Sequence, residues 1–182
     1  LSLTGRIELS NALPGPLAKQ QLPLARLQSG FRLALDSNDE RENRISFDAL
    51  DAQLFGNGAI DGSIAIWPGR PLTLAGASIP QTRTQLRFRA IDASLFAEAL
   101  PPTALGGTLM LDREAFALDL AQDAATTKRL MPERFAANAA PVRITAKGKI
   151  DDQTLRLSQA SARLADSSVQ LSGQAALVAP WT

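Results

Sequence analysis

The residues most similar in type and spacing to a ligand-binding loop are the glycines of segment 56–62, Gly-Asn-Gly-Ala-Ile-Asp-Gly. A dinucleotide-binding glycine loop must open into a helix, because the helix N-terminus holds the pyrophosphate. Here apolar residues continue at alternate positions, at Ile60, Ile64 and Ile66, which is the pattern of a strand. We therefore interpret the segment as a hairpin turn, and we expect no cofactor.

Two groups of carboxylates are candidates for cation binding or acid–base chemistry. Segment 36–40 resembles a calcium loop, but an EF-hand needs glycine at its sixth position and a bidentate acid at its twelfth. This chain has Arg41 and Phe47 there, which favours a solvated hairpin tip. Asp151 and Asp152 are adjacent, and neighbours on a strand or tight turn point apart, whereas glycosidase carboxylates converge from distant segments.

The residue types that are missing restrict the chemistry further. The chain has no His, no Cys and no Tyr. Zinc and transition-metal sites draw mainly on Cys and His, so we expect no metal site. General acid–base catalysis near neutral pH most often uses His, and thiol nucleophiles need Cys, so we expect no enzyme. The absence of Cys fits an oxidising compartment and also fits a disulfide-free cytosolic chain.

Charge gives no indication of a nucleic-acid partner. The net charge is +1, and the charged residues are scattered without a run of one sign. Arg83, Arg87 and Arg89, and separately Lys128 and Arg129, are candidates for contact with phosphate head groups. The alternative is a solvated strand face whose charges keep the protein soluble and protect sheet edges.

Length and hydropathy indicate one elongated unit, residues 1–182, belonging to a longer protein. The 182 residues suffice for one domain or two small ones. No apolar stretch approaches the roughly 20 residues that span a bilayer. The chain begins at Leu1 without a charged-then-apolar leader, so we expect any anchor to lie outside it.

Apolar and polar residues alternate along most of the chain, which predicts an all-β fold. Strict alternation places one dry and one wet face on each strand, the pattern of antiparallel sheets. Segments 112–115 and 151–154 are expected to be four-residue hairpin loops, and segments 56–58 and 166–168 to be further turns. Residues 11–28 are expected to be irregular.

An internal repeat is superimposed on this alternation. Residues 45–54 match residues 155–164 at an offset of 110, and residues 60–66 match 171–177 at an offset of 111. Both copies contain one step of three between apolar residues, which predicts a β-bulge or bend. We expect two pseudo-repeats, about 1–75 and 84–182. A short helix over residues 92–100, capped by Asp92 and carrying Leu95, Phe96 and Leu100 on one face, would separate them.

A shorter motif, Gly-x-apolar, occurs at Gly5, Gly62, Gly107 and Gly148. Glycine within a strand indicates a bend or a close approach of another backbone, as a curved sheet requires. We therefore expect a curved, mostly antiparallel repeat sheet that forms an elongated trough.

The apolar face of this sheet has two interpretations. It closes on itself as the core of a sandwich or barrel, or it stays partly open as a groove for acyl chains or an unfolded strand. In the second case the groove would be lined by the large apolar residues of the alternating segments. These are Ile45, Phe47, Leu54, Ile60, Ile64, Ile66, Leu86, Phe88, Leu109, Leu111, Phe116, Leu118, Ile144, Ile150, Leu155, Leu157, Leu164, Leu171 and Leu177.

Residues 144–173 resemble the repeat of the TamB family, within the AsmA-like superfamily. One strand ends in Gly148-Lys-Ile150, a turn leads to Leu155-Arg-Leu157, and Leu171-Ser-Gly173 lies in a third strand. Segment 45–66 fits the same frame less cleanly, and segment 86–111 is similar to a connection in that family. The resemblance covers about two thirds of the chain.

The resemblance implies a β-taco, a long sheet folded lengthwise around an apolar lumen in the periplasm, within a parent protein anchored in the bacterial inner membrane. The implied partners are neighbouring β-repeats of the same parent chain, phospholipid or unfolded outer-membrane protein, and the outer-membrane barrel protein TamA. The implied roles are phospholipid transport and assembly of autotransporters or other outer-membrane proteins.

Two other functions remain open. The chain could be a structural β-repeat spacer or interaction scaffold with a closed core. A carboxylate-based glycan-active protein is disfavoured, since only two Trp and no Tyr are present for stacking on sugars.

Overall fold

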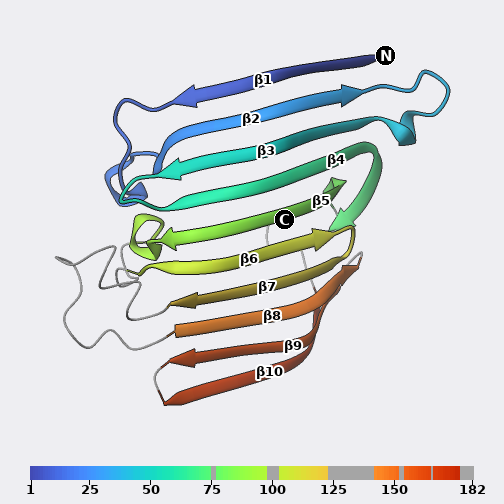
Figure 1. Cartoon of the computed structure of the whole chain (residues 1–182). Coiled ribbons are helices and arrows are strands. Elements are labelled where there is room, and N and C mark those ends of the chain that lie inside the picture. Colours follow the sequence, from blue (N-terminus) through green and yellow to red (C-terminus); the bar gives the residue numbers. More distant parts are fainter. Residues whose placement is uncertain (75–76, 98–102, 123–141, 152–153, 165, 177–182) are drawn as a thin grey trace.

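The described residues form a single antiparallel sheet in which the strands follow one another in sequence order (Figure 1). The computed structural model describes residues 1–74, 77–97, 103–122, 142–151, 154–164 and 166–176. Within these residues the strands are β1 Ser2–Ser10, β2 Leu24–Ala34, β3 Arg44–Leu54, β4 Ala59–Leu74, β5 Ala77–Ile91, β6 Leu105–Asp112, β7 Ala115–Gln122, β8 Val142–Asp151, β9 Thr154–Leu164 and β10 Ser167–Ala176. The predicted all-β, antiparallel class is confirmed.

The alternation of residue types has the expected consequence for exposure. Along residues 83–89 of β5, Arg83, Gln85 and Arg87 are exposed, whereas the intervening Thr84 and Leu86 are half-buried. Successive side chains of a strand point to opposite faces, so one face of the sheet is polar and the other apolar. The antiparallel pairing keeps this division in phase from strand to strand.

The predicted helix over residues 92–100 is wrong in its extent. It is a single 3₁₀ turn, η3 Ala93–Leu95, and residues 98–102, with Leu100 among them, lie outside the described part. Asp92 caps it as predicted, because its carboxylate accepts the Ser94 N–H at 3.0 Å. Leu95 is buried while Phe96 is 45% exposed, so these two side chains do not share a buried face.

The described residues contain two further 3₁₀ turns, η1 Leu17–Lys19 and η2 Glu40–Glu42. They also contain no helix with the length and apolar character needed to cross a membrane.

Three other expectations about connections need correction. Residues 11–28 are not all irregular, because β2 begins at Leu24; a register shift after Leu24 hides the alternation there. Asp112 pairs with Ala115, which shortens the first predicted four-residue loop to two residues. Asp151 likewise pairs with Thr154 in the second. Segment 56–58 is a tight turn as predicted, with Gly56 and Asn57 both at positive φ.

Both copies of the internal repeat contain the predicted bulge. In the pairing of β3 with β4, β3 advances by three residues, from Phe47 to Leu50, while β4 advances by only two, from Ile64 to Gly62. Between β9 and β10 the same irregularity lies between Leu157 and Ala160. The bulge returns the apolar residues to one face after the step of three, and it adds local bend and twist. Ala49, inside the first bulge, has a left-handed φ of 52°.

The Gly-x-apolar glycines are places of close approach, as predicted. A Cβ at Gly62 would overlap the Gln85 carbonyl of β5, and a Cβ at Gly107 would overlap the Asp119 carbonyl of β7. A Cβ at Gly148 would overlap the Arg156 carbonyl of β9. Gly5 and Gly148 are also covered by the aromatic rings of their cross-strand partners, Phe31 and Phe116. Covering a strand glycine with an aromatic ring excludes water from the exposed backbone.

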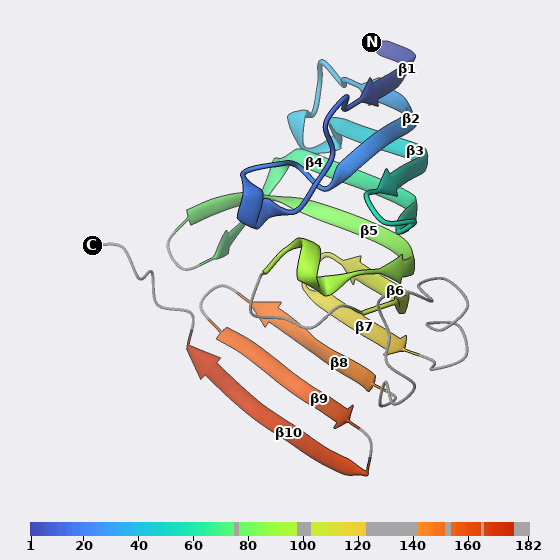
Figure 2. The same ribbon diagram turned by 90° about the vertical axis from the view of Figure 1, so that its left-hand side faces the viewer.

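The sheet is strongly twisted and curved, as Figure 2 shows from the change in strand direction between β2 and β9. In the β4–β5 hairpin the register passes from Trp67–Gln81 to Pro71–Pro80, so three residues of β4 have no partner. The strand bends there, and its outer part approaches β8, although three strands lie between them in the sheet. The sheet is therefore a trough that curls over one of its faces.

The buried apolar core of the described residues is small and lies at one end of the trough, called here the closed end. Leu54, Leu95 and Leu105 are at most 9% exposed, where β3 ends, β6 begins and η3 lies. The Asp92 carboxylate and the Thr103 side chain fix η3 there: Thr103 N–H donates to Asp92 at 3.1 Å, and the Thr103 hydroxyl accepts the Ala93 N–H at 2.7 Å. The two groups are buried but hydrogen-bonded, which removes the cost of burying them.

Replacing Gly62 by alanine tests the close approach of the strands. We expect Gly62→Ala to lower the free energy of unfolding by roughly 2 kcal/mol or more, because the methyl group would meet the backbone of β5. At Gly56 a Cβ meets nothing within 4 Å, so Gly56→Ala carries only the cost of its positive φ, about 1 kcal/mol. Denaturant midpoints followed by tryptophan fluorescence measure both; equal losses would contradict the close approach.

Ala49 tests the bulge in the opposite direction. A non-glycine residue at φ 52° is strained, so we expect Ala49→Gly to raise stability by about 0.5–1 kcal/mol. Ala65, in the regular part of β4, is the matched control: Ala65→Gly should lower stability by about 0.5–1 kcal/mol. Destabilisation by both changes would show that β3 has no left-handed bulge at this position.

Candidate functional site

The register aligns the apolar face into rows that run across the whole sheet. One row, called here the first row, has one residue from each described strand, each paired with the next. Its members are Gly5, Phe31, Phe47, Ile64, Thr84, Leu111, Phe116, Gly148, Leu157 and Gly173. Only Thr84 among them carries a polar group, so the row is a continuous apolar strip that runs perpendicular to the strands.

A second row lies four residues away along β4. Its members are Leu9, Leu27, Ala52, Ile60, Phe88, Gly107, Leu120, Ile144, Ala162 and Val169. Between the two, a middle row contains Leu50, Gly62, Leu86, Leu109, Leu118, Ala146, Ala160 and Leu171. With about 4.8 Å between strands and 3.3 Å per residue, these rows cover roughly 43 Å by 13 Å along the curved surface.

The structure brings most of the predicted groove residues together on this face. The predicted residues that are half-buried are Ile45, Phe47, Ile60, Ile64, Ile66, Leu86, Phe88, Leu109, Leu111, Phe116, Leu118, Ile144, Ile150, Leu155 and Leu157. Leu54 is buried at the closed end, and Leu171 on β10 is 62% exposed. The backbone of Leu164 pairs with Val142, and Leu177 lies outside the described residues.

Several residues of the rows were not among the predicted groove residues. Leu9, Leu27 and Phe31 bring β1 and β2 into the surface, and Leu120 extends it on β7. The alternation of β1 and of residues 31–35 is visible in the sequence. Whether these residues belong to the rows depends on which strands pair and in which register, and the periodicity of the sequence does not specify either.

Within the described residues, no second sheet or helical layer covers the rows. The exposure of the side chains agrees: large aliphatic and aromatic groups in a close-packed core are fully buried, whereas these are half-buried. The buried Leu54 and Leu105 are in phase with the rows, which places the end near η3 on the apolar side. The apolar face is thus packed at one end, and along most of its length its side chains are half-buried and keep partial contact with solvent.

The opposite face carries complementary charges. Arg83 pairs with Asp112 at 3.1 Å, Arg89 with Asp61 at 3.1 Å, and Arg143 with Asp119 at 2.9 Å. Such exposed pairs each contribute about 0–1 kcal/mol, and their main effect is solubility. Of the residues considered for head-group contact, Arg83 and Arg89 are therefore in ion pairs, and Arg87 is exposed. Lys128 and Arg129 lie outside the described residues.

A further ion pair on this face joins Arg26 to Glu8 at 2.7 Å. The Gln28 side chain, which donates to Glu8, lowers the pKa of that carboxyl, and Arg26 lowers it further.

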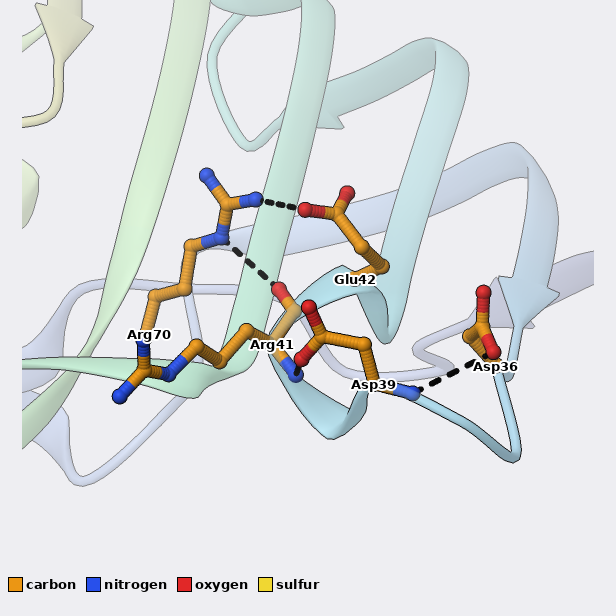
Figure 3. Close-up of polar contacts among 5 residues, drawn as sticks. All are labelled: Asp36, Asp39, Arg41, Glu42 and Arg70. Atoms are coloured by element: carbon orange, nitrogen blue, oxygen red, sulfur yellow. Dashed lines mark hydrogen bonds and ion pairs between the residues drawn. The ribbon is translucent and has the colours of Figure 1, made fainter.

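The acidic loop after β2 uses its carboxylates to shape the chain (Figure 3). Asp36 accepts the N–H groups of Asn38 and Asp39, and Asp39 accepts the N–H of Arg41 at 2.9 Å. Arg70, at the bend of β4, donates to the Arg41 carbonyl at 2.8 Å and also pairs with Glu42. These bonds attach the bend of the long hairpin to the loop.

No group of three or more potential metal ligands comes together in the parts of the chain that the structure describes. The chain matches no protein-family model, and neither curated proteins nor solved structures give a significant match.

A polar substitution on the apolar face should have a small effect on stability. Ile64→Asn places an amide where water has access, so we expect a loss of about 1 kcal/mol in the free energy of unfolding. Leu95→Asn places the same amide in the closed end and leaves a cavity, so we expect roughly 3 kcal/mol or more.

Denaturant titration compares these two variants with Arg87→Gln, an exposed polar-face control expected to be neutral. A loss at Ile64 as large as that at Leu95 would mean that the apolar face is covered.

Proposed function

We propose that the chain is a non-catalytic segment of a hydrophobic β-groove that shields lipid acyl chains or apolar polypeptide from water. The observation that supports it is the exposed apolar surface formed by the two rows and the middle row, which is continuous across β1 to β10. Contiguous apolar surface of this extent is unusual on a protein unless it contacts a ligand, a membrane or another protein.

The dimensions and energetics suit an extended apolar ligand. Each methylene group that moves from water to an apolar surface gains about 0.8 kcal/mol, so a whole acyl chain is held without specific polar contacts. One leaflet of a bilayer is about 15 Å of hydrocarbon, and the rows extend roughly 43 Å across the strands. The surface is therefore long enough for an acyl chain to move along it while it stays shielded.

The cellular setting of the proposal comes from the resemblance of residues 144–173 to the TamB family. In that setting the segment belongs to a periplasmic protein anchored in the inner membrane and takes part in outer-membrane biogenesis. Its partners are neighbouring β-repeats of the parent, phospholipid or unfolded outer-membrane protein, and the barrel protein TamA.

Retention of lipid tests the groove. We expect the chain, after incubation with phospholipid micelles and separation from them, to carry lipid that native mass spectrometry detects. Leu109→Arg and Leu118→Arg place charges in the middle row, so each should reduce the bound fraction at least about tenfold. Arg32→Gln, on the polar face of β2, is the matched control and should bind as the unaltered chain does.

Parallel measurements distinguish lipid from polypeptide as the cargo, and they distinguish the groove from a structural spacer. Protection of an unfolded outer-membrane strand from aggregation, in the absence of bound lipid, identifies polypeptide as the cargo. If the unaltered chain retains neither lipid nor polypeptide, the groove proposal fails and a structural spacer remains.

A further inference from the structure

A pocket of about 360 Å³ lies over β7, β8 and β9, away from the residues of the closed end. Six residues that line it belong to the polar face of these strands. They are Ala115, Ala117, Lys147, Lys149, Arg156 and Ser158.

The alternation of the strands places the pocket on the polar face. The remaining lining residues are Phe116, Gly148 and Leu157, which are successive members of the first row and whose side chains belong to the other face. Their apolar-face neighbours Leu118 and Leu155 do not line the pocket. On that other face the Phe116 ring already covers Gly148. The pocket is therefore on the opposite side of the sheet from the apolar rows.

The charges around this pocket differ from those on the rest of the polar face. Lys149 is the cross-strand neighbour of Arg156 on β9, so two positive side chains lie side by side. On the other side Lys149 and Lys147 pair with Ala115 and Ala117 of β7. The described residues provide no ion pair for Lys147 or Lys149.

The same β7 strand carries an aspartate only two residues further on. Asp119 forms an ion pair with Arg143 of β8, with 2.9 Å between the nitrogen and the oxygen, so β7 does supply a carboxylate to a nearby cation of β8. Positions 115 and 117 of β7 carry alanines and no carboxylate, and their small side chains leave the space that forms the pocket. Two lysines that form no ion pair with the described residues, beside an apolar floor, are the surroundings of an anion that brings a small organic group.

We propose that this pocket binds a phosphate monoester, carried either by a soluble small molecule or by a lipid head group. A phosphate monoester has a charge of about −1.5 to −2 and three acceptor oxygens, which match the charge and the donors of the two lysine ammonium groups. The volume is at the lower end of the roughly 300–1,000 Å³ that small-molecule sites occupy. The alanine methyl groups contact the organic part of the ester.

Calorimetric titration with glycerol 3-phosphate tests the site directly, because this ligand has no acyl chain and cannot use the apolar rows. We expect saturable binding with a dissociation constant of about 1 mM or lower, weakened by added salt. Lys147→Ala combined with Lys149→Ala should weaken it at least about tenfold. Arg32→Gln, on the same face but outside the pocket, should leave it unchanged.

A second variant tests the phosphate site without removing a cation. Ala115→Asp supplies the carboxylate that β7 lacks, opposite Lys149, so it should raise the melting temperature and also weaken glycerol 3-phosphate binding at least about tenfold. Unchanged binding in Ala115→Asp, or no binding of glycerol 3-phosphate to the unaltered chain, would overturn the proposal. The melting temperature shows that each variant is folded.

Vesicles distinguish the two sources of the phosphate group. Phosphatidylcholine vesicles with and without phosphatidic acid are titrated with the chain. Binding that needs phosphatidic acid and is lost in the double lysine variant identifies a lipid head group, whereas binding of glycerol 3-phosphate alone identifies a soluble ester. The double lysine variant should still retain lipid in the mass-spectrometric assay, so failure of one site is distinguishable from failure of the other.

Discussion

In-register alignment of apolar side chains across the antiparallel ladder is the constraint on which the rest of this structure depends. A shift of one residue in any strand would transfer that strand's apolar side chains to the polar face. The rows through Phe47 and Ile64 and through Ile60 and Phe88 exist because each strand keeps the phase of its neighbour. The apolar face, the ion-paired polar face and the pocket lined by Lys147 and Lys149 all follow from this division.

The glycines and bulges preserve the division while the sheet curves. At Phe47 and Leu50 the apolar residues are three apart, and the bulge absorbs the odd residue that would otherwise reverse the faces. At Gly62 and Gly107 the absence of a side chain lets neighbouring backbones come close, so the trough can bend without steric conflict. Arg70 and Glu42 then attach the bent end of the β4–β5 hairpin to the loop after β2.

The fold class, the bulges and most of the groove surface could be predicted from the sequence, because period two and its single steps of three are local properties. The extent of the helix after Asp92 could not be predicted, because hydrogen bonds from Thr103, which is distant in sequence, hold Asp92 and the start of this turn in place. The place of Phe31 in the first row and of Ala115 opposite Lys149 depends on strand pairing, which no local pattern specifies. The phosphate pocket was missed for the same reason.

Single-cysteine scanning of β6 measures the central claim most directly, since the chain has no cysteine of its own. Cysteines at positions 108–112 are labelled with a thiol reagent, with and without bound phospholipid. Lipid should protect positions 109 and 111, on the apolar face, and leave 108, 110 and 112 reactive. Equal protection of all five positions, or protection of none, would contradict a groove that holds lipid on one face of the sheet.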